Sequence, residues 1–407
     1  MKGYKQTKIG LIPKDWEVVR LGDITVRKPK YGINAPAIKY SYELPTYIRI
    51  TDIDDNGNFN KSKRVSVDYE NWEEFLLEES DILFARTGAT VGKSYLYKKE
   101  DGKLVYAGYL IKFSINKELI LPQFLKYWVN TNYYWYWVKK MSVRSGQPGI
   151  NAEEYKKLLI PLPPLKEQEK IAKILSTWDE AIESQEKLIK EKEKFKKALM
   201  QRLLKIDDKK REPKVRFKEF SGEWVDVDLE GLVNSRDILL GRGEVISKKD
   251  IENIKGNYPI YSSSTKNNGL FGYYGKYMFD EELITWSIDG GGDFFYRPKH
   301  KFSITNVSGF IKVLKKGKIN TYFLALILQY KKQFLHFDYQ SKAHPGVIKK
   351  LYKFYIPPTL KEQEKIADVL STIDKEIDLL KLELNELKKQ KKALMQKLLT
   401  GKVRVEV

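Results

Sequence analysis

The stretch LKEQEKIAKILSTWDEAI, residues 165–182, occurs again as LKEQEKIADVLSTIDKEI at residues 360–377, an offset of 195 residues. Both copies continue without a gap, to KKALMQRLL at residues 196–204 and to KKALMQKLL at residues 391–399. Duplication is the simplest cause of so long a match at a fixed offset. The chain is therefore organised around this repeat.

Each copy is predicted to form one long helix, because a Pro–Pro pair precedes it and no Pro or Gly interrupts residues 165–204 or 360–399. In the second copy, apolar residues recur at alternating steps of four and three, which is the seam of a coiled coil that misses one position at Lys391. These residues are Ile366, Leu370, Ile373, Ile377, Leu380, Leu384, Leu387, Leu394 and Leu398.

The first copy keeps most of this seam but places Gln185, Lys192 and Lys196 on the same stripe, which weakens its centre. These polar residues either fix the register of a helix pair or form a solvent-facing stripe. We expect the two copies to pair with each other in antiparallel fashion. Such pairing gives the chain an internal two-fold axis, and the helices then act as a spacer.

The segments before the two helices also correspond. Trp16 and Leu21 in IGLIPKDWEVVRLGDI match Trp224 and Leu229 in FSGEWVDVDLEGLV. The segments that begin at Gly108 and at Gly309 both read as a strand, a turn and a helix. The middles of the two units, residues 27–107 and 234–306, share little sequence, which suggests two related domains that read different ligands.

The predicted fold is α/β (α+β), with two globular domains separated by two long helices that form an intramolecular antiparallel coiled coil. The expected boundaries are 1–160 for the first domain, 161–210 for the first helical spacer, 211–356 for the second domain and 357–407 for the second spacer.

Positive charge is concentrated in the globular segments. The chain has 74 Lys and Arg against 54 Asp and Glu, a formal net charge of +20, whereas residues 165–212 carry only +3 and residues 361–407 only +2. An excess of +15 therefore lies outside the helices, which favours a nucleic-acid partner. A lysine-rich surface without such a partner is the alternative interpretation.

Several function classes are disfavoured by composition. The chain has no cysteine and three histidines, so Cys/His zinc sites and disulfides are excluded and we expect no metal site. The first residues lack an apolar signal core, and the longest apolar runs are too short to span a membrane. These features predict a cytoplasmic protein.

The segment GATVGKS, residues 88–94, resembles a phosphate-binding loop, but its spacing fails by one because Thr87 stands where the first glycine is required. A cofactor-binding glycine loop and the target-base motif of amino-methyltransferases are also missing. No catalytic residues are therefore predicted. A nucleotide-dependent enzyme remains an alternative, which ATP turnover lost in Lys93→Ala would identify.

The candidate DNA-binding residues lie in polar, glycine-rich loops. Arginine suits guanine edges, Asn and Gln suit adenine, and Lys and hydroxyl groups suit phosphate. For each residue an ordinary surface loop is the alternative interpretation, and the aromatic run at residues 127–137 is interpreted mainly as core packing. The candidates are Arg86, Thr87, Lys93, Arg144, Ser145 and Gln147 in the first domain, and Arg236, Arg242, Ser263, Thr265, Lys266, Asn267, Asn268, Lys342 and His344 in the second.

Over essentially its whole length, the chain resembles the specificity subunits of type I restriction–modification enzymes. The resemblance rests on PKDW…LGD near the start, on IPLPPLKEQEKIA and IPPTLKEQEKIA at the helix starts, and on the matched KKALMQ ends. It implies two target-recognition domains, each reading one half of an asymmetric bipartite DNA site, with the helices setting the spacer.

The same resemblance implies two methyltransferase subunits docked on the helices, and in some complexes a motor and nuclease subunit as well. S-adenosylmethionine, ATP and Mg²⁺ would then belong to these partners, and this subunit would bind no cofactor of its own. The alternative is a stand-alone DNA-binding or coiled-coil scaffold protein without a methyltransferase partner.

Overall fold

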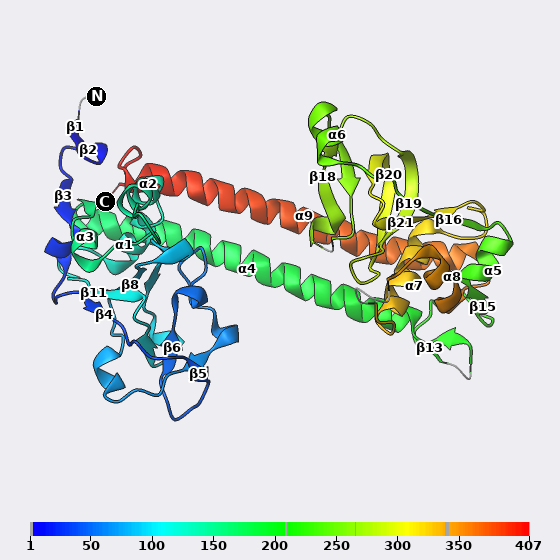
Figure 1. Ribbon diagram of the computed structural model, residues 1–407, viewed down its shortest axis with the longest axis horizontal. Helices are drawn as coiled ribbons and strands as arrows, with labels where there is room; N and C mark the ends of the chain where they lie inside the picture. The colour runs from blue at the N-terminus through cyan, green and yellow to red at the C-terminus, as the bar shows by residue number, and fades with distance from the viewer. Residues whose placement is uncertain (1–2, 208–209, 265, 338–341, 407) are drawn as a thin grey trace. The chain divides into compact units, whose positions relative to one another are not determined.

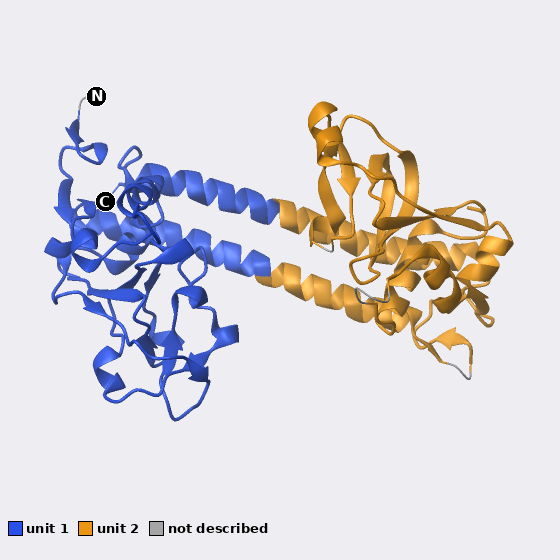
Figure 2. Ribbon diagram, viewed as in Figure 1, with its two compact units in different colours: residues 1–186, 383–407 blue, residues 187–382 orange. Residues whose placement is uncertain are grey.

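The computed structural model describes residues 3–207, 210–264, 266–337 and 342–406. The chain divides into two compact units, residues 1–186 with 383–407 and residues 187–382 (Figure 2). The two long helices, α4 (Leu165–Leu204) and α9 (Leu360–Leu399), are 40 residues each, and each contributes one end to each unit. We keep the names first and second domain for the globular parts expected at residues 1–160 and 211–356.

The first domain contains two four-stranded sheets, with strand orders β4-β11-β8-β9 and β10-β6-β7-β5, and a β1-β2 hairpin (Figure 1). Three short helices follow the last strand of these sheets, β11. The elements are β1 (Tyr4–Thr7), β2 (Gly10–Pro13), β4 (Lys30–Tyr31), β5 (Ile38–Lys39), β6 (Thr46–Ile48), β7 (Val65–Ser66), β8 (Asp81–Ala85), β9 (Ser94–Leu96), β10 (Leu104–Tyr106), β11 (Leu110–Ser114), α1 (Pro122–Trp128), α2 (Asn132–Met141) and α3 (Ala152–Tyr155).

The second domain is built on one six-stranded sheet with strand order β16-β21-β19-β20-β17-β18. A parallel bridge between Glu244 and Thr305 joins the ends of β16 and β20, so the sheet curls back on itself. The elements are β13 (Ile206–Asp207), β14 (Glu212–Pro213), α5 (Leu229–Asn234), β16 (Ile238–Arg242), α6 (Lys248–Asn253), β17 (Tyr258–Tyr261), β18 (Leu270–Tyr274), β19 (Phe279–Ser287), β20 (Phe294–Ile304), β21 (Ser308–Val313), α7 (Thr321–Lys332) and α8 (Pro345–Leu351).

Each domain has an equivalent antiparallel strand pair, formed by one strand near its start and one near its end. Strand β3 (Glu17–Arg20) pairs with β12 (Leu159–Leu162), and β15 (Val225–Asp228) pairs with β22 (Lys353–Ile356). The residues just before β3 and β15 are Trp16 and Trp224, which are 0% and 1% exposed. The predicted correspondence of the segments around the two tryptophans is therefore confirmed.

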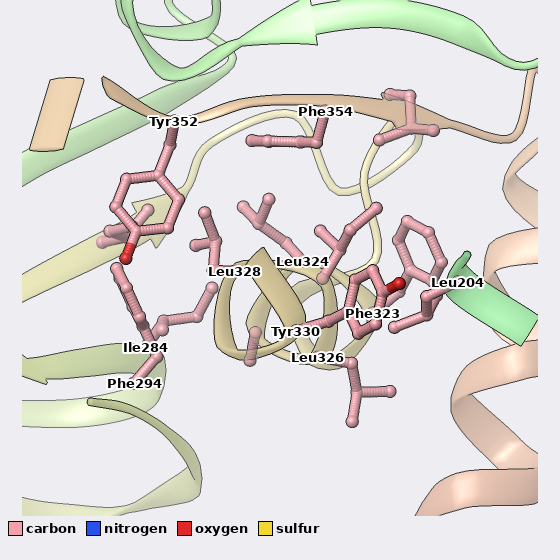
Figure 3. Close-up of a cluster of buried hydrophobic side chains, with 14 of the residues drawn as sticks. Leu204, Ile284, Phe294, Phe323, Leu324, Leu326, Leu328, Tyr330, Tyr352 and Phe354 are labelled. Atoms are coloured by element: carbon pink, nitrogen blue, oxygen red, sulfur yellow. The ribbon is translucent and has the colours of Figure 1, made fainter. Parts of the chain in front are cut away.

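The core of the second domain surrounds α7, in which residues on almost every side are buried (Figure 3). Leu204 at the end of α4 and Ile366 near the start of α9 belong to the same cluster. In the first domain, Leu175 of α4 and Leu398 of α9 join the core in the same way. The ends of the two helices are therefore part of the two cores. Each buried aliphatic side chain contributes roughly 1.5–3 kcal/mol to the stability of the fold.

The glutamine of each LKEQEK motif is buried and fixes the turn that leads to a domain helix. Gln363 accepts a hydrogen bond from the backbone N of Asn320 (3.0 Å) and donates to the carbonyl oxygen of Lys318 (3.1 Å). Gln168 accepts from the N of Leu121 at 2.7 Å and donates to the carbonyl of Leu119 at 3.2 Å. Because a buried amide needs these partners, the motif joins each helix to its domain.

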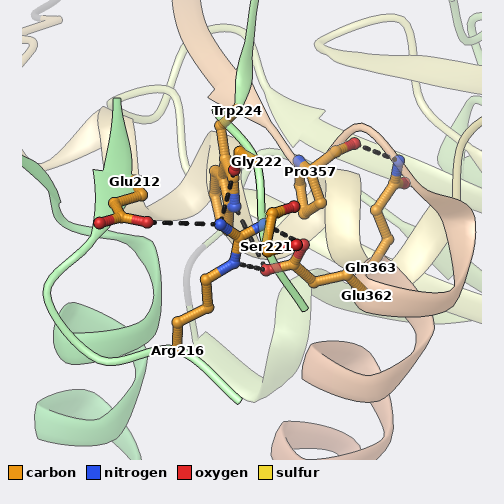
Figure 4. A network of polar contacts seen from close by, with 8 residues as sticks. All are labelled: Glu212, Arg216, Ser221, Gly222, Trp224, Pro357, Glu362 and Gln363. Atoms are coloured by element: carbon orange, nitrogen blue, oxygen red, sulfur yellow. Dashed lines mark hydrogen bonds and ion pairs between the residues drawn. The ribbon is translucent and has the colours of Figure 1, made fainter. Parts of the chain in front are cut away.

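The glutamate of each motif is 1% exposed and binds a tryptophan and an arginine. Figure 4 shows Glu362, which accepts hydrogen bonds from Trp224 Nε1 at 3.3 Å and from both Nε and Nη2 of Arg216 at 2.8 Å. The equivalent contacts of Glu167 come from Trp16 Nε1 at 2.9 Å and from Arg404 at 2.7 and 2.9 Å. A buried carboxylate is stable only when paired in this manner, so each glutamate needs both its tryptophan and its arginine.

The helices pair in antiparallel fashion in each unit, as predicted. Asp179 of α4 lies 2.5 Å from Lys391 of α9 in the first unit, and Lys196 lies 2.5 Å from Asp374 in the second. The hydroxyl groups of Tyr127 and Tyr322, which also differ by 195 residues, donate to Asp179 and Asp374. The internal repeat therefore extends to individual contacts.

The polar residues in the seam of α4 face acidic partners on α9. Gln185 donates to Glu383 at 2.9 Å, and Lys192 lies 2.6 Å from Glu376. Together with the Lys196–Asp374 pair, these contacts show that the three residues belong to the interface, so the interpretation as a solvent-facing stripe was wrong. Within the described ranges, no helix has the length and hydropathy needed to cross a membrane.

Candidate nucleic-acid interface

In the first domain, the loop after β8 and the loop before α3 are held together by backbone contacts. Thr87 forms an antiparallel bridge with Gly149, and the N of Gly88 donates to the carbonyl oxygen of Pro148 at 3.0 Å. These contacts place the candidates Arg86 and Thr87 beside the loop that carries the candidates Arg144, Ser145 and Gln147. The two loops form one surface, which we call the first loop surface.

The side chains of this surface differ in how free they are to bind a ligand. Arg86 is exposed, and its guanidinium lies 4.9 Å from the centre of the Tyr31 ring, a contact that restricts the side chain without neutralising it. Ser145 and Gln147 are exposed. Arg144 donates to both carboxylate oxygens of Glu154 at 2.6 Å, so DNA would have to compete with Glu154 for its charge.

The GATVGKS segment forms a turn packed against α2. Gly92 has a φ of +91°, and a Cβ atom there would lie 2.7 Å from Val138, so both conformation and space require glycine. The candidate Lys93 binds Asp55 at 2.7 Å and the carbonyl oxygen of Ile53 at 3.4 Å. Its hydrogen bond lowers the pKa of Asp55. Lys93 therefore points to the loop at residues 53–55 instead of cradling a phosphate.

In the second domain, loops that are far apart in sequence converge at the curled part of the sheet. Arg242 Nη2 donates to the carbonyl oxygen of Asn306 at 2.7 Å, and Thr305 Oγ1 donates to Ser262 Oγ at 3.0 Å. A Cβ atom on Gly290 would lie 2.3 Å from the carbonyl oxygen of Ser263, so these two loops touch through their backbones. We call this convergence the second loop surface.

The segment before α8 completes the second loop surface. Lys342 lies 3.1 Å from Asp289, and the N of Ala343 donates to the carbonyl oxygen of Ile288 at 3.1 Å. His344 follows as the residue that precedes the first turn of α8. The structure therefore brings together, from three separate segments, Arg242, Ser263, Lys266, Asn267, Asn268, Lys342 and His344.

One described candidate of the second domain stands apart from this set. Arg236 is exposed in a left-handed conformation (φ 54°) before β16, whereas Arg242 is the last residue of that strand. At about 3.3 Å per residue, the length of β16 separates them by roughly 20 Å. Thr265 lies outside the described residues.

Sequence reasoning missed Arg297, a 4% exposed residue that lies beneath the second loop surface and contacts its backbone. Its Nε donates to Thr285 Oγ1 at 3.0 Å, its Nη2 donates to the carbonyl oxygen of Asn268 at 2.7 Å, and its guanidinium lies 3.7 Å from the centre of the Tyr261 ring. Burial lowers the pKa of Arg297 to about 10, so it stays charged at pH 7. A single arginine within a strand carries no signal that could have identified it.

The backbone held by Arg297 is unusual. Asn267 and Asn268 have φ values of +49° and +52°, a left-handed conformation that asparagine adopts more readily than most residues. Arg297 therefore stabilises a loop that presents two amide side chains.

A cleft of about 750 Å³ lies between the first domain and the helix ends of the first unit. Part of its wall is ion-paired, through Lys61 with Asp101 at 2.7 Å and Lys388 with Glu186 at 2.6 Å. Among the residues that the structure describes, no three His, Asp or Glu side chains are grouped so as to hold a metal ion. We assign the cleft no ligand.

The sequence profile of a known family covers most of the chain. The profile of the type I restriction modification DNA specificity domain matches residues 13–194 and again residues 221–389. Each match includes one domain and most of the helix that follows it.

Relatives of similar length are found in Methanocaldococcus jannaschii. A chain assigned as the specificity subunit of the type I restriction enzyme MjaX is 31% identical, over 100% of this chain and 97% of the relative. The specificity subunit of the type I restriction enzyme MjaVIII is 26% identical, over 97% of this chain and 94% of the relative.

Solved structures share the fold. The S subunit of a type I restriction-modification system from M. genitalium superimposes with a TM-score of 0.60 at 16% identity, covering 96% of both chains. A chain from a structure that describes complex assembly and conformational transition of a type I system gives a TM-score of 0.55 at 17% identity, covering 96% of this chain and 99% of the other. The likeness therefore includes both domains and both long helices.

Proposed function

Because this chain belongs to the family of type I restriction–modification DNA specificity proteins, we propose that its two loop surfaces each read one half of a bipartite DNA site. The observation that carries the proposal is the contrast between a closely repeated scaffold and two different loop surfaces. The tryptophan, glutamate and glutamine contacts recur in both units, whereas the strands of the two domains are ordered differently. Two different surfaces imply two different half-sites.

In the first half-site, Arg86, Thr87, Ser145 and Gln147 would contact DNA directly. Lys93 and Arg144 would do so only after they exchange Asp55 and Glu154 for phosphate or base edges. In the second, Arg242, Ser263, Lys266, Asn267, Asn268, Lys342 and His344 would act together. Arg236 stays in the proposal as a contact at the margin of the second loop surface, and Thr265 stays in it as a candidate outside the described residues.

The chemistry would come from partner subunits. We assign two methyltransferase subunits, which bring S-adenosylmethionine, to the paired helices, and a motor and nuclease subunit with ATP and Mg²⁺ to the complete complex. The chain itself then has no catalytic residue, binds no cofactor, and acts in the cytoplasm on chromosomal DNA. The ion pair of Lys93 with Asp55 supports this division of roles, because it engages the one lysine that a phosphate loop at GATVGKS would use.

Mapping of methylated bases in cells that express this chain with its neighbouring methyltransferase tests the proposal. We expect adenine methylation at a two-part motif with a fixed gap, lost when this chain is deleted. Unchanged methylation would favour a stand-alone DNA-binding or scaffold protein. Purification then separates the two functions, because a specificity subunit should be recovered with two large partner chains.

A further inference from the structure

The contacts between α4 and α9 fall into two classes when each residue is compared with its counterpart in the other helix, 195 residues away in the sequence. The pairs Asp179–Lys391 and Lys196–Asp374 are equivalent, because 179 and 374, and 196 and 391, are matched positions. Each helix therefore carries one Asp and one Lys of this class. Two copies of α4, or two copies of α9, could form the same pairs with each other.

A second class lacks this property. Glu186 lies 2.6 Å from Lys388, and Glu193 lies 2.7 Å from Lys381. The repeat matches position 186 with 381 and position 193 with 388, so α4 carries glutamate at both positions and α9 carries lysine at both. Pairing of two α4 helices in the same geometry would place Glu186 against Glu193, and pairing of two α9 helices would place Lys381 against Lys388.

The seam contacts of Lys192 and Gln185 are also specific to unlike helices. Lys192 binds Glu376 and Gln185 binds Glu383, but the positions of α9 that match Lys192 and Gln185 are apolar. In an α4–α4 pair Lys192 would face Ala181, and in an α9–α9 pair Glu376 would face Leu387. Like pairing would therefore leave a charge in the seam without its counter-ion, which is unfavourable.

We propose that these four contacts direct α4 to pair with α9 and oppose pairing of either helix with the like helix of a second copy. A second copy is the natural competitor, because duplication leaves two nearly identical helices and because Leu380, Leu384 and Leu387 give α9 an apolar seam that could match itself. Charges beside a coiled-coil seam choose between partners in this way. Each helix pair therefore joins one first domain and one second domain, whatever ligand the domains bind.

The double variant Glu193→Lys/Lys388→Glu tests this proposal at constant net charge. In the parent geometry it sets Glu186 against the glutamate introduced at position 388, and Lys381 against the lysine introduced at position 193. In like pairs, by contrast, every one of these contacts becomes attractive. We expect a concentration-dependent doubling of mass in light scattering and a drop in Tm of about 4 °C for the monomer.

The matched control is Glu193→Lys/Lys381→Glu, which also conserves net charge but keeps attractive contacts between unlike helices. It should stay monomeric with a Tm close to that of the parent, because intrachain pairing benefits from a high effective concentration. Equal mass and Tm for the two double variants at all concentrations would overturn the proposal.

A cysteine at Ile189 identifies which helices pair. Ile189 is 6% exposed in the seam between Glu186 and Glu193, and the chain has no other cysteine. In the Glu193→Lys/Lys388→Glu background, Ile189→Cys should form an interchain disulfide under mild oxidation, and in the control background it should not. A dimer without this disulfide would contradict α4–α4 pairing.

Discussion

Asp237 shows how a single buried carboxylate stabilises the second domain. It is 0% exposed, and it binds Lys315 at 2.8 Å and also Lys318. Burial acts to raise the pKa of Asp237, but the hydrogen bonds from Lys315, Lys318 and Ser235 outweigh it and lower this pKa from 3.8 to about 2. The ionised carboxylate therefore stabilises the fold at pH values above 3.8, and this contribution is lost as the pH falls toward 2.

We expect Asp237→Asn to reduce the free energy of unfolding by about 1–2 kcal/mol at pH 7 and by about half as much at pH 3. Urea denaturation at the two pH values measures the difference, with the exposed Asp226→Asn as a control. The same loss at both pH values would show that the stabilisation does not depend on ionisation.

At the residue scale, sequence could locate loops but not contacts. The Ser, Lys and Asn run from Ser263 was found because these residue types favour loops and suit bases and phosphates. Glu154, which binds Arg144, and Asp55, which binds Lys93, could not be foreseen, because only the fold brings such partners together. Arg297 was missed for the same reason, since Asn268 is 29 residues away from it.

At the scale of elements, the long helices were predictable because 40 residues of coiled-coil pattern outweigh local ambiguity. The expected spacers at 161–210 and 357–407 contain helices at Leu165–Leu204 and Leu360–Leu399. The strand and helix expected after Gly108 and after Gly309 are present as β11 with α1 and as β21 with α7. The order of the strands in the sheets was not predictable, since many strands have only two to five residues, too few to establish an alternating pattern. The interhelical partners of Gln185 and Lys192 could also be identified only from the structure.

Matched deletion of one heptad from both helices tests their role as a spacer. Removing residues 183–189 and 378–384 shortens each helix by about 10 Å, which corresponds to roughly 3 base pairs. The Asp179–Lys391 and Lys196–Asp374 pairs lie outside the deleted segments and should keep the register. We expect the gap in the methylated motif to shorten while both halves stay the same.

Deletion from α4 alone is the control, because it breaks the register and should abolish methylation. An unchanged gap after the matched deletion would refute the idea that the helices measure the spacer.

At the scale of the whole molecule, the chain combines a repeated scaffold with two unlike domains. The scaffold is specified twice in the sequence, by tryptophan, Glu–Gln and coiled-coil patterns at similar offsets. Its contacts recur accordingly, from Trp16–Glu167 to Trp224–Glu362. The middle segments of the two domains share little sequence with each other. A duplicated chain can therefore present two different surfaces.

The most direct test of this account is methylation mapping with one loop surface altered at a time. Arg86→Ala/Gln147→Ala removes side chains from the first loop surface. Asn267→Gly/Asn268→Gly removes amides from the second and still permits the left-handed backbone there. The account predicts that each pair relaxes the sequence of a different half of the motif and leaves the gap and the other half unchanged. A motif altered in both halves by either pair, or unaltered by both, would contradict it.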